Sequence, residues 1–305
     1  MKYVIGIDGG GTKTRYTLST HDLEIIEDFT DSTIHYQQVG FEQVTIRLNK
    51  NIAKLIAKVD DVNLITHVFV GLPGYGDIKN DTPNLEAAVK NGLGNLSYTI
   101  GNDTENALSG SLNGSYGINV IVGTGSIGLG ITRDGRRYTS GGWCHDFGGD
   151  EGSAYWLACR MLLEYTQQSD NRKPKTLLYT YLNDELQLED DTDILDLTLN
   201  KYKMDRTKIA SLSVHLSALA SLNDSAALAI FKEAAYELSK IYLAIFNELK
   251  FDTSVPISYS GGIFKSGKFI LEPLKSTLAE NNLTLSDPVH DPSVGGLLLA
   301  IKASK

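Results

Sequence analysis

Residues 8–14 have the sequence DGGGTKT, which contains an acid, three glycines, two threonines and a lysine. Backbone amides of such a loop can bind phosphate oxygens, while Lys13 adds positive charge and Asp8 can hold Mg²⁺ through water. The spacing is not that of the P-loop, Gly-x-x-x-x-Gly-Lys-Ser/Thr, and the residues that follow indicate a strand rather than the required helix. The segment therefore predicts a phosphate-binding hairpin loop, with a simple tight turn as the alternative.

A second glycine loop, GTGS at residues 123–126, follows the apolar run 118–122. With Gly128 it matches the dinucleotide pattern Gly-x-Gly-x-x-Gly, but the next residues alternate as a strand, whereas that pattern must open a helix. NAD binding is therefore disfavoured. The order strand, glycine loop, strand repeats that of the first loop about 115 residues earlier, which indicates an internal duplication. We expect the two loops to bind the phosphates of one nucleotide from both sides of a cleft.

Asp103 stands between the predicted strand 97–101 and the predicted helix 104–112. As a helix N-cap it would accept hydrogen bonds from the first helical turn. A carboxylate at the C-terminal end of a strand is also suited to accept the proton of a substrate hydroxyl in phosphoryl transfer. One residue could serve both purposes.

Trp143 follows two glycines, and Asp150 lies in the segment GDEGS at residues 149–153. An aromatic ring and a carboxylate beside glycine turns suit the apolar face and the hydroxyls of a sugar. The alternative is a packed Trp143 and an Asp150 that caps a helix. His145 and Asp146 can form a local polar pair, to which we assign no chemistry. A metal cluster is disfavoured because four histidines show no ligand spacing between them: His35, His67, His145 and His290.

The elements that must position these residues follow from the periodicity of the chain. Alternating or apolar runs predict strands at 3–7, 14–20, 24–29, 65–70, 97–101, 118–122, 127–132 and 255–259, with a hairpin turn at 133–136. Apolar spacings of three and four predict helices at 41–59 and 225–249. Pro83 and Pro292 mark the first turns of two more helices, the last with Asp291 as N-cap. Residues 151–250 are predicted to be mostly helical, and the acidic run 184–196 within them indicates a solvated face rather than a cation site.

Composition narrows the class of protein. The chain has 305 residues, of which 28 are basic and 37 acidic, giving a net charge of −9. This balance argues against a general nucleic-acid or anionic membrane surface, although not against a small anion held by amides. Apolar residues make up 42%, no apolar run approaches the ~18 residues of a membrane span, and Cys144 and Cys159 lack Cys-x-x-Cys spacing. We expect a two-domain globular protein of the cytoplasm, with reduced cysteines and no zinc site.

Seven segments together resemble the N-acetylglucosamine kinases of the BadF/BadG/BcrA/BcrD ATPase family. They are IGIDGGGTKT (5–14), GNDTENAL (101–108), VGTGS (122–126), GGW (141–143), GDEGSAYW (149–156), SGGIF (260–264) and DPSVGGLLLA (291–300). The resemblance covers essentially the whole chain. GDEGSAYW after GGW is specific to this branch, whereas the phosphate loops alone would fit any actin-like sugar kinase or chaperone ATPase.

The resemblance implies an α/β protein of two ribonuclease H-like (actin-like ATPase) domains around a central cleft. Residues 1–115 would form the first domain, with a last helix at 291–305 packing back on it. Residues 116–290 would form the second domain, with the helical insertion at about 151–250. ATP and Mg²⁺ are the implied cofactors, and an amino sugar is the implied substrate.

By position the resemblance also implies roles for individual residues. Asp8 is the implied Mg²⁺-linked acid, and Asp103 is the implied catalytic base. The implied nucleotide-binding residues are Gly10, Gly11, Thr12 and Lys13, then Gly123, Thr124, Gly125 and Ser126, and finally Gly261 and Gly262 on the adenosine side. The implied substrate-binding residues are Gly142, Trp143, Cys144 and Asp150, together with Asp103.

Two departures from the family pattern concern the sugar. Residues 32–36 lack the Asn that usually contacts it, and the loop 143–150 is one residue longer, with Cys144 where Gly is common. The predicted reaction is ATP-dependent phosphorylation of N-acetylglucosamine or a related N-acetylhexosamine such as N-acetylmuramic acid. A homodimer is compatible with the resemblance.

Two alternatives to this reaction stay open. One is an ATPase that activates 2-hydroxyacyl-CoA dehydratases, which requires thiolates for an iron–sulfur cluster. The spacing of the two cysteines does not match that arrangement. The other is a sugar sensor without catalysis, against which the retained acids and Lys13 argue.

Overall fold

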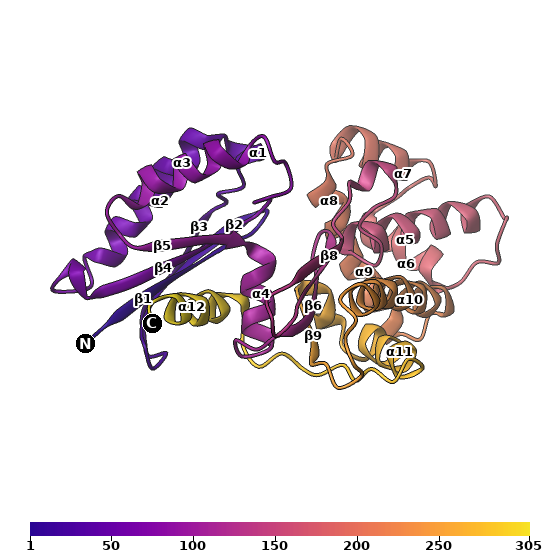
Figure 1. Cartoon of the computed structure of the whole chain (residues 1–305). Coiled ribbons are helices and arrows are strands. Elements are labelled where there is room, and N and C mark those ends of the chain that lie inside the picture. The colour runs from indigo at the N-terminus through magenta and orange to yellow at the C-terminus, as the bar shows by residue number, and fades with distance from the viewer. The chain divides into compact units, whose positions relative to one another are not determined.

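The computed structural model describes the backbone of residues 1–305 and all side chains except that of Phe147. It divides into two compact units, each with its own sheet (Figure 1). Unit 1 consists of residues 1–119 and 286–305, and unit 2 consists of residues 120–285. The observed α/β class confirms the prediction from the sequence.

Unit 1 is built on a five-stranded sheet in the order β3-β2-β1-β4-β5. The first three strands form an antiparallel meander, while β4 and β5 extend the sheet parallel to β1. The strands are β1 Tyr3–Gly9, β2 Lys13–Thr20, β3 Ile25–Ser32, β4 Ile65–Leu72 and β5 Tyr98–Asn102. The predicted strands of this region are confirmed, with ends that differ by a few residues. The apolar residues of β1, β2 and β4 are buried, whereas β3 is half-buried or exposed along its length.

Helices cover both faces of this sheet (Figure 1). Successive side chains of a strand point to opposite faces, so Ile5 packs into the core that includes α2 and α3, whereas Val4 packs against Leu297 of α12. Asp291 occupies the predicted N-cap position of α12, but its side chain makes no capping hydrogen bond within the described residues. The helices of unit 1 are α1 Tyr36–Val39, α2 Phe41–Ile56, the 3₁₀ turn η1 Val62–Leu64, α3 Thr82–Leu93, α4 Asp103–Ser111 and α12 Pro292–Ala303.

Unit 2 contains a four-stranded sheet in the order β8-β7-β6-β9. Its strands are β6 Gly117–Val122, β7 Ser126–Ile131, β8 Arg137–Gly141 and β9 Ile257–Ser260. β7 and β8 form the predicted antiparallel hairpin, and Gly135 turns the chain with a φ of +85°. A side chain at Gly128 would overlap Ile241 and Ile245 of the long helix α10, so that glycine lets α10 approach the sheet.

The segment between β8 and β9 is mostly helical, as predicted. Its elements are η2 His145–Phe147, α5 Ala154–Ser169, α6 Leu177–Leu186, α7 Asp193–Leu195, the π-helix η3 Asp196–Lys201, α8 Arg206–Ser211, α9 Ser213–Ser221 and α10 Ser225–Glu248. After β9 come η4 Gly262–Ser266 and α11 Lys268–Ala279.

The acidic run of this segment is mostly solvated, as predicted, and Asp184, Asp190 and Asp196 are exposed. Asp191 differs from them because its carboxylate accepts hydrogen bonds from Ser169 Oγ at 2.6 Å and Tyr179 OH at 2.8 Å. That acid therefore fastens α5 to α6.

Among the described residues, no single helix is long and apolar enough to cross a membrane. Two neighbouring helical segments, Arg206–Ser221 and Ser225–Glu248, are long and apolar enough only when they are taken together. The chain bends by 118° between them.

Candidate active site

The first glycine loop of unit 1 joins β1 to β2 and is held by the segment that follows β3. The Gly10 amide donates to the Lys13 carbonyl at 2.9 Å and closes the turn. Thr33 Oγ1 donates to the Gly10 carbonyl at 2.6 Å, and Gln38 Nε2 donates to the Gly11 carbonyl at 2.9 Å. These side chains bind the loop's carbonyl groups, while Gly11, Thr12 and Lys13 are exposed. The predicted hairpin loop is thus present and open to a ligand.

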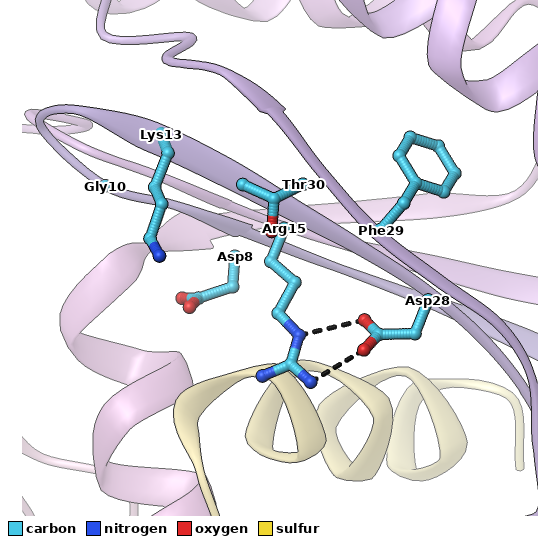
Figure 2. Close-up of a pocket in the computed structure, with 7 residues that line it drawn as sticks. All are labelled: Asp8, Gly10, Lys13, Arg15, Asp28, Phe29 and Thr30. Carbon is cyan, nitrogen blue, oxygen red and sulfur yellow. Dashed lines mark hydrogen bonds and ion pairs between the residues drawn. The ribbon is translucent and has the colours of Figure 1, made fainter.

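Beside this loop is a cavity of about 490 Å³, within the size range of ligand sites. It is lined by Asp8, Gly10, Lys13, Arg15, Asp28, Phe29 and Thr30. Figure 2 shows the side chains of Asp8 and Lys13 directed into the same space. Arg15 donates to both carboxylate oxygens of Asp28, at 2.8 and 2.7 Å, so its guanidinium group already binds a carboxylate. None of the ion pairs between described side chains involves Lys13, so its ammonium group is available to an anion.

Three acids of unit 1 lie at the C-terminal ends of parallel strands, where α/β sheets commonly bind ligands. Asp8 is near the end of β1, Asp77 follows β4, and Asp103 follows β5. Removal from water raises the pKa of Asp8 to about 6, although a hydrogen bond from Asn106 Nδ2 at 3.0 Å opposes the shift. Burial and the charges of Asp8 and Asp77 raise the pKa of Asp103 to about 7. A carboxyl group with that pKa is matched to proton transfer near neutral pH.

The prediction that Asp103 caps the following helix is wrong. Asn102 is the N-cap: its Oδ1 accepts from the Thr104 amide at 3.0 Å, and Glu105 Oε1 accepts from the Asn102 amide at 3.3 Å. The Asn-x-x-Glu spacing of this capping box stands in the sequence and could have identified the cap. Because Asn102 fills that role, the carboxylate of Asp103 is left for other chemistry.

The second glycine loop, residues 123–126 of unit 2, is held by the start of α5. The amides of Ala154 and Tyr155 donate to the carbonyls of Gly123 and Thr124 at 2.9 and 3.3 Å. Ser126 is buried, and its hydroxyl donates to the Glu151 carbonyl at 2.8 Å. This hydroxyl therefore anchors the loop, and the part left open to a ligand is residues 123–125.

Asp150 is buried beside the second loop and has a left-handed backbone with a φ of +66°. Its Oδ1 accepts from the Ser126 amide at 3.1 Å, and its Oδ2 accepts from Arg206 Nη2. The helix-capping alternative for Asp150 is wrong, since Ser153 Oγ accepts from the Trp156 amide at 3.2 Å and caps α5. Arg206, 56 residues away in sequence, carried no local signal that could have identified it.

The loop after β8 presents Trp143 and Cys144 to solvent. Trp143 is 72% exposed, so the alternative of a packed Trp is wrong. The Gly142 amide donates to the Ser126 carbonyl at 2.8 Å, which ties this loop to the second glycine loop. Cys144 and Cys159 are free thiols, as predicted, and the expected His145–Asp146 pair is present at 3.4 Å. Cys144, His145 and Asp146 bring three potential metal-ligand atoms within 4.8 Å of one another, which the spacing of the histidines did not predict.

Gly261 joins β9 to η4 with a φ of +105°. A side chain there would overlap the backbone of Val122, so this glycine permits the close approach of the ends of β6 and β9. A Cβ at Gly262 would meet no other atom within 4 Å. The structure thus gathers the predicted residues into two sets, one in each unit: Asp8, the first loop and Asp103 in unit 1, and the second loop, Gly142, Asp150 and Gly261 in unit 2.

Comparison with known proteins places this arrangement in a family. Residues 5–300 match the BadF/BadG/BcrA/BcrD ATPase family. The chain belongs to this family. It is 30% identical to N-acetyl-D-glucosamine kinase of Dictyostelium discoideum, over 99% of this chain and 98% of that protein. It is 29% identical to N-acetylmuramic acid/N-acetylglucosamine kinase of Clostridium acetobutylicum, over 98% of both chains.

Solved structures support the fold of this family member. The crystal structure of a provisionally assigned N-acetylglucosamine kinase from Chromobacterium violaceum has a TM-score of 0.77 and 23% identity, covering 98% of this chain and 99% of that one. A ROK family glucokinase from Streptomyces griseus, in complex with glucose and AMPPNP, has a TM-score of 0.58 and 18% identity, covering 98% and 99%. The fold is that of the actin-like sugar kinases, as predicted.

Proposed function

We propose that this protein transfers the γ-phosphoryl group of ATP to a hydroxyl of N-acetylglucosamine or a related N-acetylhexosamine such as N-acetylmuramic acid. The observation that carries the proposal is Asp103, a carboxyl group with a pKa of about 7 at the end of β5 that is not used to cap its helix. The family and the two kinases of similar sequence supply the substrate class.

Asp103 acts as general base in this reaction. As the sugar oxygen attacks the γ-phosphorus, its proton passes to the Asp103 carboxylate, and the bond to the bridging oxygen breaks to release ADP. Phosphoryl transfer depends mainly on positioning and on neutralisation of phosphate charge. In unit 1, Lys13 and the exposed amides of residues 11–12 position the phosphates and neutralise their charge.

The acids of unit 1 fit a magnesium ion. Asp8 and Asp103 are half-buried, burial raises the pKa of each, and the charge of Asp8 raises the pKa of Asp103 further. Carboxylate oxygens are ligands that Mg²⁺ prefers, and Asn106 fixes the orientation of Asp8. Asp8 would hold Mg²⁺ through water, and the bound ion would neutralise phosphate charge.

Further ligand contacts are proposed for residues of unit 2. Residues 123–125 bind phosphate oxygens, and Gly261 with Gly262 borders the adenosine. The exposed ring of Trp143 stacks on the apolar face of the sugar, while Gly142 and Cys144 form part of its pocket. A direct contact between Asp150 and the sugar stays a prediction, because both of its oxygens already bind protein groups.

The dehydratase activator gains no support from the thiols of this chain. Burial raises the pKa of Cys159, which disfavours the thiolate needed for a cluster. A colourless protein after purification without oxygen is the expected result.

The test is ADP release with Mg²⁺ and ATP in the presence of glucosamine, N-acetylglucosamine, N-acetylmuramic acid, N-acetylmannosamine or glucose, against a control without sugar. We expect one or more of the N-acetylated sugars to stimulate ADP release, with a phosphorylated sugar formed in equal amount. ATP turnover that no sugar changes would contradict the kinase, and tight sugar binding without ADP release would favour the sensor.

A further inference from the structure

Arg206, the first residue of α8, reaches the second glycine loop through Asp150. Its Nη2 donates to Asp150 Oδ2, and Asp150 Oδ1 accepts from the Ser126 amide at 3.1 Å. A chain of three groups therefore links the helical segment to the backbone of the loop. Asp150 is only 3% exposed, so this ion pair provides the charge that a buried carboxylate requires.

The guanidinium also lies against the loop itself. A side chain at Gly125 would overlap both Arg206 Nη2 and the carboxylate of Asp150, so these groups fill the space behind the Gly125 Cα. Arg206 Nε is buried without a hydrogen-bond partner among the described residues, while the side chain as a whole is 40% exposed. Among the described residues, the guanidinium donates its side-chain hydrogen bond to Asp150, which itself has a strained, left-handed backbone with a φ of +66°.

We propose that Arg206 is a positioning residue for nucleotide binding: it acts through Asp150 to hold Ser126 and keep residues 123–125 shaped for phosphate. This proposal deepens the proposed function and rests on it. Without Arg206, the buried carboxylate would turn toward water and release the Ser126 amide, and the loop would lose one of the contacts that fix its end at β7. ATP binding would weaken, while the groups of unit 1 would remain unchanged.

The test compares Arg206→Ala, Arg206→Lys, Asp150→Asn and the double variant with the unaltered protein. Arg160→Ala is the matched control, because Arg160 donates to Glu233 at 2.7 Å within the same helical segment and is similarly exposed, at 38%. The measurements are the Kd of Mg²⁺–ADP by calorimetry and the KM values for ATP and sugar, with circular dichroism and thermal unfolding to confirm folding.

We expect Arg206→Ala to raise the Kd of ADP and the KM of ATP about tenfold, with a smaller change in the sugar KM. Arg206→Lys should recover part of the lost nucleotide affinity, since lysine keeps the positive charge but lacks the planar guanidinium group. In the Asp150→Asn background, removal of Arg206 should add less than about twofold, because the two residues act as one unit. Arg160→Ala should leave nucleotide affinity within about twofold of the unaltered protein.

Other results would overturn the proposal. Folded Arg206→Ala with unchanged ADP affinity would show that the ion pair serves stability alone. An undiminished effect of Arg206→Ala in the Asp150→Asn background would show that Arg206 acts on the nucleotide directly. If Arg206→Ala does not fold, the ADP affinity of Arg206→Lys is measured instead. An unchanged affinity in that variant would also contradict the proposal. An unaltered protein that does not bind ADP would overturn the proposed function and this inference together, an outcome distinct from the others.

Discussion

Each unit places a carboxylate beside a glycine loop, but the two carboxylates have different partners. In unit 1, Asp8 receives a hydrogen bond from the uncharged Asn106, and its pKa is raised to about 6. In unit 2, Asp150 receives hydrogen bonds from a backbone amide and from the Arg206 guanidinium. Among the described side chains, Asp8 thus forms no ion pair, whereas Asp150 pairs with Arg206. We therefore propose that Asp8 is available to an external cation, while the contacts of Asp150 with Ser126 and Arg206 support its loop.

The loops are also fastened by different means. The carbonyls of the first loop are bound by two side chains, Thr33 and Gln38. The carbonyls of the second loop are bound by backbone amides at the start of α5. Replacement of Thr33 or Gln38 can therefore loosen the first loop, while the side chains that hold the second loop are Ser126, Asp150 and Arg206.

The largest expected effect comes from Asp103 in unit 1. Asp103→Asn keeps the shape of the side chain but cannot accept a proton, so kcat should fall about 10²–10⁴-fold. The Kd of Mg²⁺–ADP should change less than about twofold, since Asp103 is not part of either glycine loop. Asp60→Asn, an exposed acid of the same unit, is the matched control. An unchanged kcat would remove Asp103 from the role of base.

The pH dependence should report the same group. The pKa of Asp103 is raised from 3.8 to about 7, and the base must be ionised, so kcat/KM should rise with pH and level off above 7. Below pH 7 it should fall about tenfold per pH unit, and more steeply below the pKa of Asp8 at about 6. A rate that is constant from pH 5 to 8, with chemistry rate-limiting, would contradict this assignment.

A smaller effect is expected from the side chains that hold the first loop. Gln38→Ala removes the hydrogen bond to the Gly11 carbonyl, which should raise the KM of ATP about two- to tenfold and leave the sugar KM unchanged. Gln37→Ala is the matched control, since Gln37 donates to Tyr36 OH instead. Equal effects of the two variants would show that the tether to the loop does not matter.

Local patterns predicted most of the elements and both glycine loops. The alternation in β1 and β2 and the three-and-four spacing in α2 and α10 each express one buried face, so they can be detected without tertiary information. The sequence placed the end of helix α2 at residue 59, three residues beyond its observed end at Ile56. The prediction was too long because the apolar spacing continues into the turn that follows the helix.

The partners of the site residues could not be predicted in the same way. Arg206 and Asp150 meet only because α8 packs within its unit, and Asp77 joins the acids of unit 1 only because β4 and β5 are adjacent in the sheet. Asn102 and Asp103 are both favourable N-caps by type, and the choice between them depends on Glu105. Sequence patterns therefore identified the residues that could take part in catalysis or binding. The residues that interact with their charges could be identified only from the folded structure.

The contrast between Asp8 and Asp150 can be measured through the magnesium dependence of sugar-stimulated ADP release at saturating ATP. We expect Asp8→Asn to raise the Mg²⁺ concentration for half-maximal activity by about tenfold or more, because the ion would lose its water-mediated contact with a carboxylate. Asp150→Asn should leave that concentration within about twofold, although its KM for ATP rises. A shift of the magnesium midpoint in Asp150→Asn, together with an unchanged midpoint in Asp8→Asn, would contradict the account.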